Sequence, residues 1–302
     1  SRENLWVVDY IFGEEPACHY FIDLDPSTNV SMVTRPRSTP LLSGVRTQQG
    51  LRHLWTTFSN DQIDLNYANP DVLVEFIDIM LYYLRRGARM VRLDAVAYLW
   101  KKLGTNCIHL PQTHQVIKLL RDVVELVEPG ALLMTETNVP HAENISYFGA
   151  GDEAHVVYQF SLPPLLLHAL YAGNSEYLNA WAQSLEAFEL PPNCTFLNFT
   201  ASHDGVGLRP LEGLVPVAES SAMLDAMRER GAVTCTAGKD VVRFAPPLTI
   251  DVGSRATPVM VDWNQDGRLD LLVGALDGKL RVYLDTMGET LSIIYPGESV
   301  GE

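Results

Sequence analysis

Two long segments of the chain repeat apolar residues at the spacing of an amphipathic helix. The first, "NPDVLVEFIDIMLYYLRRGAR" from residue 69, begins with Asn69, which can cap a helix, and Pro70, which suits a first turn. The second, "LPQTHQVIKLLRDVVELVEPG" from residue 110, ends at a Pro-Gly pair that stops a helix. We expect a helix in each segment.

Short apolar runs around these helices predict strands. They cover residues 90–97, 131–137, 155–160 and 195–204. Nearly continuous apolar strands that alternate with amphipathic helices are typical of a parallel sheet buried on both faces. We therefore predict an α/β fold. In such folds, and above all in barrels, active sites gather at the C-terminal ends of the strands.

The two ends of the chain lack this alternation. Residues 1–69 are rich in turn formers, as in "DPSTN" and "RPRSTP", and we expect a long loop region there. After residue 230 short β runs alternate with Gly/Asp turns. We predict a first domain over residues 1–235 and a small all-β module over 236–302.

Composition narrows the choice of partners. The 302-residue chain is 47% hydrophobic, which is enough for a core, and its formal net charge is −15. Such a charge argues against nucleic acid and anionic membranes as partners, so we expect a small neutral or hydroxylated substrate.

Several kinds of segment are not expected in this sequence. The four cysteines are far apart and show neither CxxC nor Cys/His ligand spacing, so we expect no disulfide framework and no zinc site. No apolar stretch approaches the roughly 20 residues of a membrane helix, and the first residues do not resemble a signal peptide. We expect a soluble chain, with an upstream leader left open because residue 1 is not Met.

Carboxylates stand at the ends of three predicted strands. Arg92 and Asp94 are two apart and share one face, Glu136 follows an apolar run, and His203 and Asp204 precede a Gly. Each has a structural alternative when taken alone: a buried ion pair, a capping acid and a turn. Acids at the C-terminal ends of several strands in one parallel sheet would instead lie close together at one edge of the sheet. Such a cluster favours a functional site over three separate structural roles. Two carboxylates that flank a sugar bond can supply a nucleophile and a general acid/base.

Ordered motifs carry a family resemblance. The stretches "VRLDAVAYLWKKLGT", "MTETNVP" and "ASHDGVGLRP" resemble the second, third and fourth signature regions of the α-amylase superfamily, glycoside hydrolase family 13. Flanking segments such as "CIHLPQTH" and "RPLEGLVP" are similar to its sucrose phosphorylase branch, in particular to glucosylglycerate phosphorylase-like members. The resemblance covers roughly residues 1–235 and implies a (β/α)8 TIM barrel.

The resemblance also implies roles for the residues. Asp94 would be the nucleophile, Glu136 the acid/base and Asp204 the transition-state stabiliser, with Arg92 and His203 as substrate-binding partners. A retaining enzyme needs the carboxyls of Asp94 and Glu136 about 5 to 5.5 Å apart. A neighbouring arginine lowers the pKa of a carboxyl and so keeps a nucleophile ionised.

In a phosphorylase, inorganic phosphate replaces water as the acceptor, so basic side chains should line a phosphate pocket. The candidates are Arg209 together with Lys101, or Arg209 together with Arg35 and Arg37. The alternative is that these are ordinary loop or surface cations. No cofactor is expected for catalysis.

The resemblance lacks the first signature region of the family. We therefore expect an incomplete barrel, about strands 4–7, with unpaired edges that can bind a partner or a second copy. A complete barrel takes about 250 residues, so we predict that this chain is weakly active or inactive.

A separate motif, "DWNQDGRLD", lies in the predicted β module. Asp262, Asn264, Asp266 and Asp270 offer oxygen ligands around Gly267, which suits Ca²⁺, and the segment resembles an FG-GAP or VCBS β-propeller repeat. An EF-hand is less suitable because no Glu stands at its twelfth position, and the structural alternative is a simple hairpin turn.

Two rival functions stay open at this point. One is an α-glucoside hydrolase, and the other is a non-catalytic carbohydrate-binding or interaction protein. The phosphorylase-like part favours a cytoplasmic protein, whereas the propeller-like part favours export. The sequence does not define the acceptor, which loop contacts would select.

Overall fold

The computed structural model describes residues 2–202, 204–230, 232–236, 240–244, 257–261, 270–274, 280–286 and 289–293. The chain divides into two compact units, Ser1–Phe244 and Ala245–Glu302. The sequence predicted a boundary near residue 236. The boundary falls later because strand β9 (Asp240–Phe244) pairs with β7 (Val206–Gly207) and β8 (Ala232–Thr236), which belong to the first unit.

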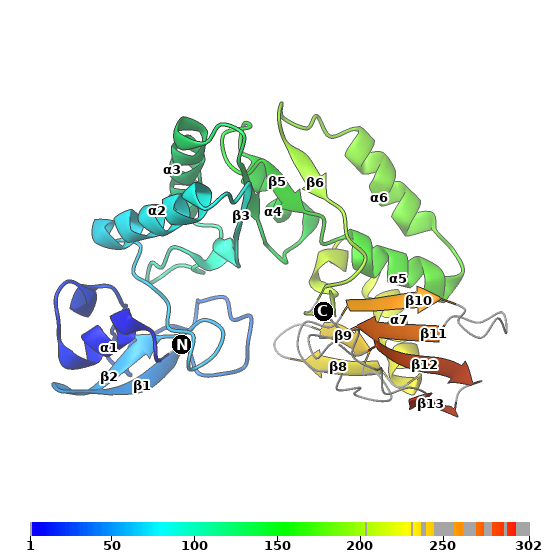
Figure 1. Ribbon diagram of the computed structural model, residues 1–302, viewed down its shortest axis with the longest axis horizontal. Helices are drawn as coiled ribbons and strands as arrows, with labels where there is room; N and C mark the ends of the chain where they lie inside the picture. Colours follow the sequence, from blue (N-terminus) through cyan, green and yellow to red (C-terminus); the bar gives the residue numbers. More distant parts are fainter. Residues whose placement is uncertain are drawn as a thin grey trace, which may run out of the picture. The chain divides into compact units, whose positions relative to one another are not determined.

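A four-stranded parallel sheet forms the centre of the first unit (Figure 1). Its strands lie in sequence order: β3 (Met90–Leu93), β4 (Leu132–Thr135), β5 (Val156–Tyr158) and β6 (Thr195–Leu197). All three pairings are parallel. The predicted α/β architecture with a parallel sheet is confirmed.

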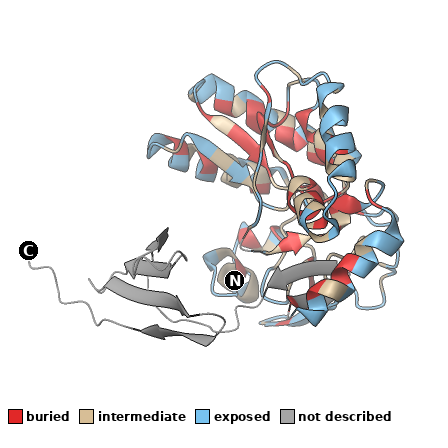
Figure 2. Ribbon diagram, turned by 90° about the vertical axis from the view of Figure 1, so that its right-hand side faces the viewer, coloured by how far each residue is buried: buried red, intermediate tan, exposed pale blue. Residues whose placement is uncertain are grey.

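Helices connect and cover these strands. They are α2 (Pro70–Arg85), α3 (Pro111–Val127), α4 (His141–Ile145), α5 (Leu162–Ala172), α6 (Glu176–Glu186) and α7 (Val217–Glu229), with 3-10 turns η2 (Val96–Tyr98), η3 (Ser146–Phe148) and η4 (Arg209–Leu211). In Figure 2 the outer surfaces of the helices are pale blue and their inner surfaces red. The helices therefore bury one face each, as amphipathic sequences require.

The first predicted helix is confirmed as α2, and its start follows from the sequence. The Asn69 side chain accepts a hydrogen bond of 3.0 Å from the Asp71 N–H, which satisfies one of the unpaired donors at the helix start. Pro70 takes the first turn, where no N–H donor is needed. The helix buries Val72, Met80 and Leu84.

The main core lies between the sheet and α2 and α3. Met80 and Leu84 of α2 pack with Ile117 of α3, Leu133 of β4 and Val157 of β5 in one buried cluster. Burying one such side chain fully is worth about 1.5–3 kcal/mol, so this cluster fixes the strand ends that carry the polar residues.

The strands are not all buried on both faces, which corrects the sequence prediction. Leu133 and Val157 in the inner strands β4 and β5 are fully buried, whereas Met90 and Arg92 in β3 are exposed. β3 and β6 are the two edge strands of the sheet. An edge strand has no neighbour on one side to cover its side chains.

The N-terminal region is not a long loop, contrary to the prediction for residues 1–69. It contains helix α1 (Leu5–Phe12), the turn η1 (Ala17–His19) and an antiparallel hairpin of β1 (Leu42–Thr47) and β2 (Gly50–Trp55). The hairpin turn lacks the Asn-Gly or Asp-Gly signal of a two-residue loop. A buried cluster that includes Val7, Tyr20, Val45 and Leu54 joins these elements.

The second unit contains four described strands that pair antiparallel in sequence order. They are β10 (Thr257–Val261), β11 (Asp270–Gly274), β12 (Leu280–Thr286) and β13 (Glu289–Ile293). Of the predicted calcium ligands, Asp262, Asn264 and Asp266 lie outside the described residues, as does the side chain of Asp270. The Ca²⁺ site and the FG-GAP or VCBS resemblance stay predictions.

None of the helices in the described part of the chain is both long enough and apolar enough to cross a membrane.

Candidate active site

A cleft of about 410 Å³ brings the three predicted carboxylates together. Asp94, Glu136 and Asp204 all line it. Asp94 follows the last residue of β3 and Glu136 the last residue of β4, and these two last residues, Leu93 and Thr135, are register partners in the parallel ladder. Asp94 and Glu136 therefore leave the sheet side by side at its C-terminal edge, where α/β folds place their sites.

Arg92 binds the first of these carboxylates and lies near the second. Its Nη2 is 2.6 Å from Asp94 Oδ1, and its Nη1 is 3.9 Å from Glu136 Oε2. The Asp94 side chain is 73% exposed. A buried structural ion pair would require the opposite, so the pair instead presents a charged carboxylate to the cleft.

The backbone after β3 holds the Glu136 carboxylate. The Ala95 N–H donates a hydrogen bond of 2.8 Å to Glu136 Oε2, and the Glu136 N–H donates one of 3.1 Å to the Leu93 carbonyl. Ala95 has a φ of 46°, in the left-handed region that residues other than glycine adopt rarely. Backbone strain of this kind is concentrated at functional sites.

Burial raises the pKa of the Glu136 carboxyl above its ordinary value, since desolvation disfavours the charged form. The hydrogen bond from the Ala95 N–H and the charge of Arg92 lower the pKa of Glu136. The charges of Asp94 and Asp204 raise it. Only 16% of the Glu136 side chain is exposed. A carboxyl that keeps its proton to higher pH suits a general acid.

Asp204 lies in a tight turn that lines the cleft. Its N–H donates to Ser202 Oγ at 3.3 Å, and Gly205, with a φ of 88°, forms a bridge with Ser202. The turn alternative for this segment is therefore correct, and the carboxylate still lines the cleft. His203 lies outside the described residues.

Three arginines line the same cleft, namely Arg35, Arg37 and Arg209. The Nε atoms of Arg35 and Arg209 are buried without a hydrogen-bond partner among the described residues. Buried donors of this kind are rare in folded proteins. Guanidinium groups that line a cleft can hold an anion through charge-assisted hydrogen bonds.

Lys101 does not belong to this group of cleft cations, which corrects the sequence-based candidate. Its Nζ lies 2.6 Å from Asp64 Oδ2, and its side chain is buried near the ring of Trp55. Lys101 therefore ties the segment after β3 to the N-terminal region.

Glu143 contacts both Arg209 and His109, an arrangement that the sequence did not reveal. Glu143 Oε2 is 3.8 Å from Arg209 Nη2 and 3.1 Å from His109 Nε2, and His109 Nδ1 is 2.7 Å from the Tyr147 hydroxyl. Burial lowers the pKa of His109, against the pull of Glu143. These contacts join residues far apart in the chain, so no local pattern could show them.

Aromatic residues line the cleft as well: Phe58, Tyr98, Phe160 and Phe199. Their faces offer apolar surface for a sugar ring. Phe160 and Phe199 lie within the predicted strands, in "VVYQF" and "TFLNFT", which is the only sequence signal for this role.

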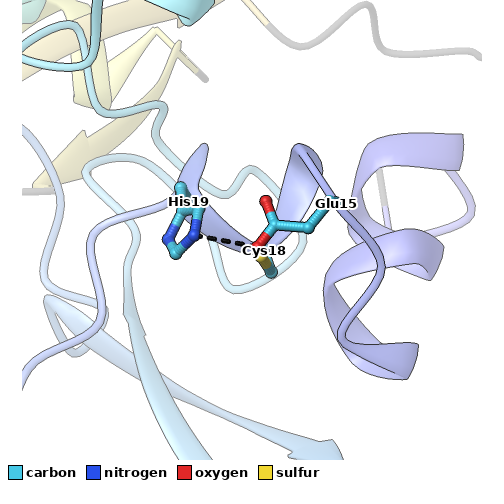
Figure 3. A group of neighbouring side chains, drawn as sticks. All are labelled: Glu15, Cys18 and His19. Atoms are coloured by element: carbon cyan, nitrogen blue, oxygen red, sulfur yellow. Dashed lines mark hydrogen bonds and ion pairs between the residues drawn. The ribbon is translucent and has the colours of Figure 1, made fainter.

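Another cluster could hold a metal ion. Glu15, Cys18 and His19 bring one ligand atom each within 4.8 Å of the others, and none of the three lines the cleft (Figure 3).

Comparison with known proteins identifies the family of the chain. The family model described as "Alpha amylase, catalytic domain" matches residues 46–204. Glucosylglycerate phosphorylase from Escherichia coli (strain K12) is 53% identical over 236 residues, which is 77% of this chain and 42% of that protein. Glucosylglycerate phosphorylase from Spirochaeta thermophila is 48% identical over 233 residues, 77% of this chain and 39% of that protein. The chain thus spans less than half the length of these curated relatives.

A solved structure shows the same fold. The sucrose 6F-phosphate phosphorylase from Thermoanaerobacter thermosaccharolyticum superposes with a TM-score of 0.68 at 23% identity, over 80% of this chain and 51% of that one. The sheet of this chain is accordingly part of a (β/α)8 barrel. Because the family model covers more than half of its residues, the chain belongs to the α-amylase family.

Proposed function

We propose that this chain carries the catalytic centre of a glucosyl phosphorylase that acts on glucosylglycerate-like or sucrose-like α-glucosides. The observation that carries the proposal is the cleft in which Asp94, Glu136 and Asp204 meet three arginines. Relatives named glucosylglycerate phosphorylase, at 53% and 48% identity, support the substrate class.

The first step forms a covalent glycosyl-enzyme. The Asp94 carboxylate attacks the anomeric carbon, and the bond from that carbon to the leaving oxygen breaks as Glu136 transfers its proton to the oxygen. Arg92 Nη2, 2.6 Å from Asp94 Oδ1, orients the nucleophile through an ion pair. The raised pKa of Glu136 keeps the proton available. Asp204 stabilises the positive charge that develops on the sugar ring.

The second step returns the enzyme to its starting state. A phosphate oxygen attacks the anomeric carbon, the ester bond to Asp94 breaks, and Glu136, now ionised, takes the proton of that phosphate oxygen. The product is a glucosyl phosphate with the configuration of the substrate. The three arginines that line the cleft, Arg35, Arg37 and Arg209, support phosphate as the acceptor, because guanidinium groups match phosphate geometry.

We expect the isolated chain to turn over slowly, because the described residues form a sheet of four parallel strands and a complete barrel has eight. A catalytic constellation works only when its surroundings hold it within a fraction of an ångström of the productive geometry.

Phosphate dependence provides the test. The 302-residue chain is incubated with glucosylglycerate or sucrose, with and without inorganic phosphate, and glucose 1-phosphate and free glucose are measured. We expect glucose 1-phosphate that disappears in Asp94→Asn and persists in the control Asp225→Asn, which changes an exposed carboxylate of α7.

The alternatives give different results. Free glucose formed at the same rate without phosphate would indicate a hydrolase. Sugar binding that Asp94→Asn leaves intact, without product from the parent chain at any enzyme concentration, would indicate a binding protein and reject the proposal.

A further inference from the structure

Three potential metal ligands converge on one short turn between α1 and the hairpin. Glu15 Oε1 is 3.1 Å from His19 Nε2, and the Cys18 thiol joins them, so that all three ligand atoms lie within 4.8 Å of one another (Figure 3). Cys18 is half-buried, whereas the side chains of Glu15 and His19 are 70% and 68% exposed. The site is therefore open to an ion from solvent.

The spacing explains why the three side chains meet. Residues three and four apart in a helical turn share one face, and Glu15, Cys18 and His19 stand at such positions around η1. Cys/His spacing rules do not cover this set of ligands, because its third member is a glutamate. The sequence-based expectation of no zinc site rested on those spacings alone.

The backbone that carries these residues is fixed by its neighbours. Ala17 and Tyr20, on either side of Cys18 and His19, are buried in the N-terminal core. The Cys18 N–H donates to the Glu14 carbonyl at 3.0 Å, and the His19 carbonyl accepts from Asn69 Nδ2 at 3.2 Å. Binding would thus need small side-chain movements and no refolding of the turn, which lowers its entropic cost.

We propose that Glu15, Cys18 and His19 form a binding site for a divalent transition-metal ion of the zinc class. Thiolate, imidazole and carboxylate are the ligands such ions take in proteins, with bonds of about 2.0–2.3 Å. Metal bonds to Cys18 Sγ, His19 Nε2 and a Glu15 oxygen replace the Glu15–His19 contact, the thiol proton passes to solvent, and water takes the fourth position. No oxidation or reduction occurs.

Binding of Co²⁺ to the reduced 302-residue chain tests this site. We expect the near-ultraviolet absorption band of a thiolate–Co²⁺ bond to saturate at one ion per chain, and Zn²⁺ to displace the Co²⁺ and abolish the band. Cys18→Ser should eliminate the band. His19→Ala should weaken binding by about tenfold or more, since even partners behind the ligands change metal affinity that much.

Two control variants keep the result specific to this cluster. Glu14→Gln removes the neighbouring carboxylate, which is not among the three ligands, and should leave the band unchanged. Cys235→Ser removes another thiol of the chain and should also leave it unchanged. All four variants are checked for folding by circular dichroism. An undiminished band in folded Cys18→Ser, or no band with the parent chain, would overturn the proposal.

Discussion

At the residue scale, we expect the protonation of Glu136 to affect both activity and stability. Its raised pKa means that the folded chain binds this proton more tightly than the unfolded chain does. As pH rises from the ordinary glutamate pKa through the raised one, the folded state loses stability relative to the unfolded state. Above that window the full cost of the buried charge is present, and below it that cost is absent.

Glu136→Gln should therefore have opposite effects on stability and activity. At neutral pH the variant should unfold at a higher temperature than the parent, because the buried charge is gone, and the difference should vanish at acid pH. Its kcat should fall by about 10²- to 10⁴-fold, the contribution typical of general acid–base catalysis. Thermal unfolding over a pH series, together with initial rates, measures both. Equal destabilisation at every pH would show that the carboxylate has a purely structural role.

Arg209 should bind phosphate through its planar guanidinium group. Arg209→Lys keeps the charge and removes the fork, so we expect the Kd for inorganic phosphate to rise by about 10- to 100-fold, the equivalent of a charge-assisted hydrogen bond of about 1.5–3 kcal/mol. Calorimetric titration of the full chain measures it. Arg86→Lys, at an arginine on the face of Tyr82 that does not line the cleft, is the matched control. An unchanged Kd in Arg209→Lys would remove Arg209 from the acceptor site.

The residues that local sequence could identify are those at strand ends. Asp94 and Glu136 each follow an apolar run, and the structure places both in the cleft. Lys101 also follows such a run, yet Asp64 binds it elsewhere, and the partner of Arg209, Glu143, lies on α4. A local pattern contains no information on which distant carboxylate reaches a cation, so these assignments needed the fold.

At the scale of elements, the sequence predicts those helices and strands whose formation depends on neighbouring residues in the chain. Helix α2 was predictable because Asn69 and Pro70 define its start through their own chemistry. The exposure of β3 was not predictable, since it depends on which strand stands at the edge of the sheet. The hairpin of β1 and β2 was missed because tertiary packing against α1 stabilises it in the absence of a strong turn signal.

The start of α2 permits a stability test at the scale of one element. Asn69→Ala removes the cap on the Asp71 N–H and the bond to the His19 carbonyl, so we expect a loss of about 0.5–2 kcal/mol. Urea unfolding measures the change. Asn29→Ala, which removes a comparable bond to the Ser31 N–H in an exposed turn, should cost less. An equal loss in both variants would contradict a specific role for the cap.

At the scale of the whole molecule, we expect the two open edges of the parallel sheet to limit the activity of the site. β3 and β6 stand at the ends of the strand order, and Met90 on β3 is an exposed apolar residue of the first of these edges. Eight strands close a barrel of this family, and closure would cover both edges and enclose the cleft. We therefore expect these edges to bind the part of a barrel that this chain does not form.

A complementation assay with a second polypeptide tests that expectation. The chain is mixed with a polypeptide that contains the portion of the Escherichia coli glucosylglycerate phosphorylase outside the matched 236 residues. Glucose 1-phosphate formation should rise by at least about tenfold over the chain alone, because added strands would hold Arg92 and Asp94 in place. The same mixture made with Asp94→Asn should stay inactive, which shows that the activity belongs to this chain. Turnover by the chain alone at the rate of the intact relative would instead show that four strands suffice to hold the nucleophile.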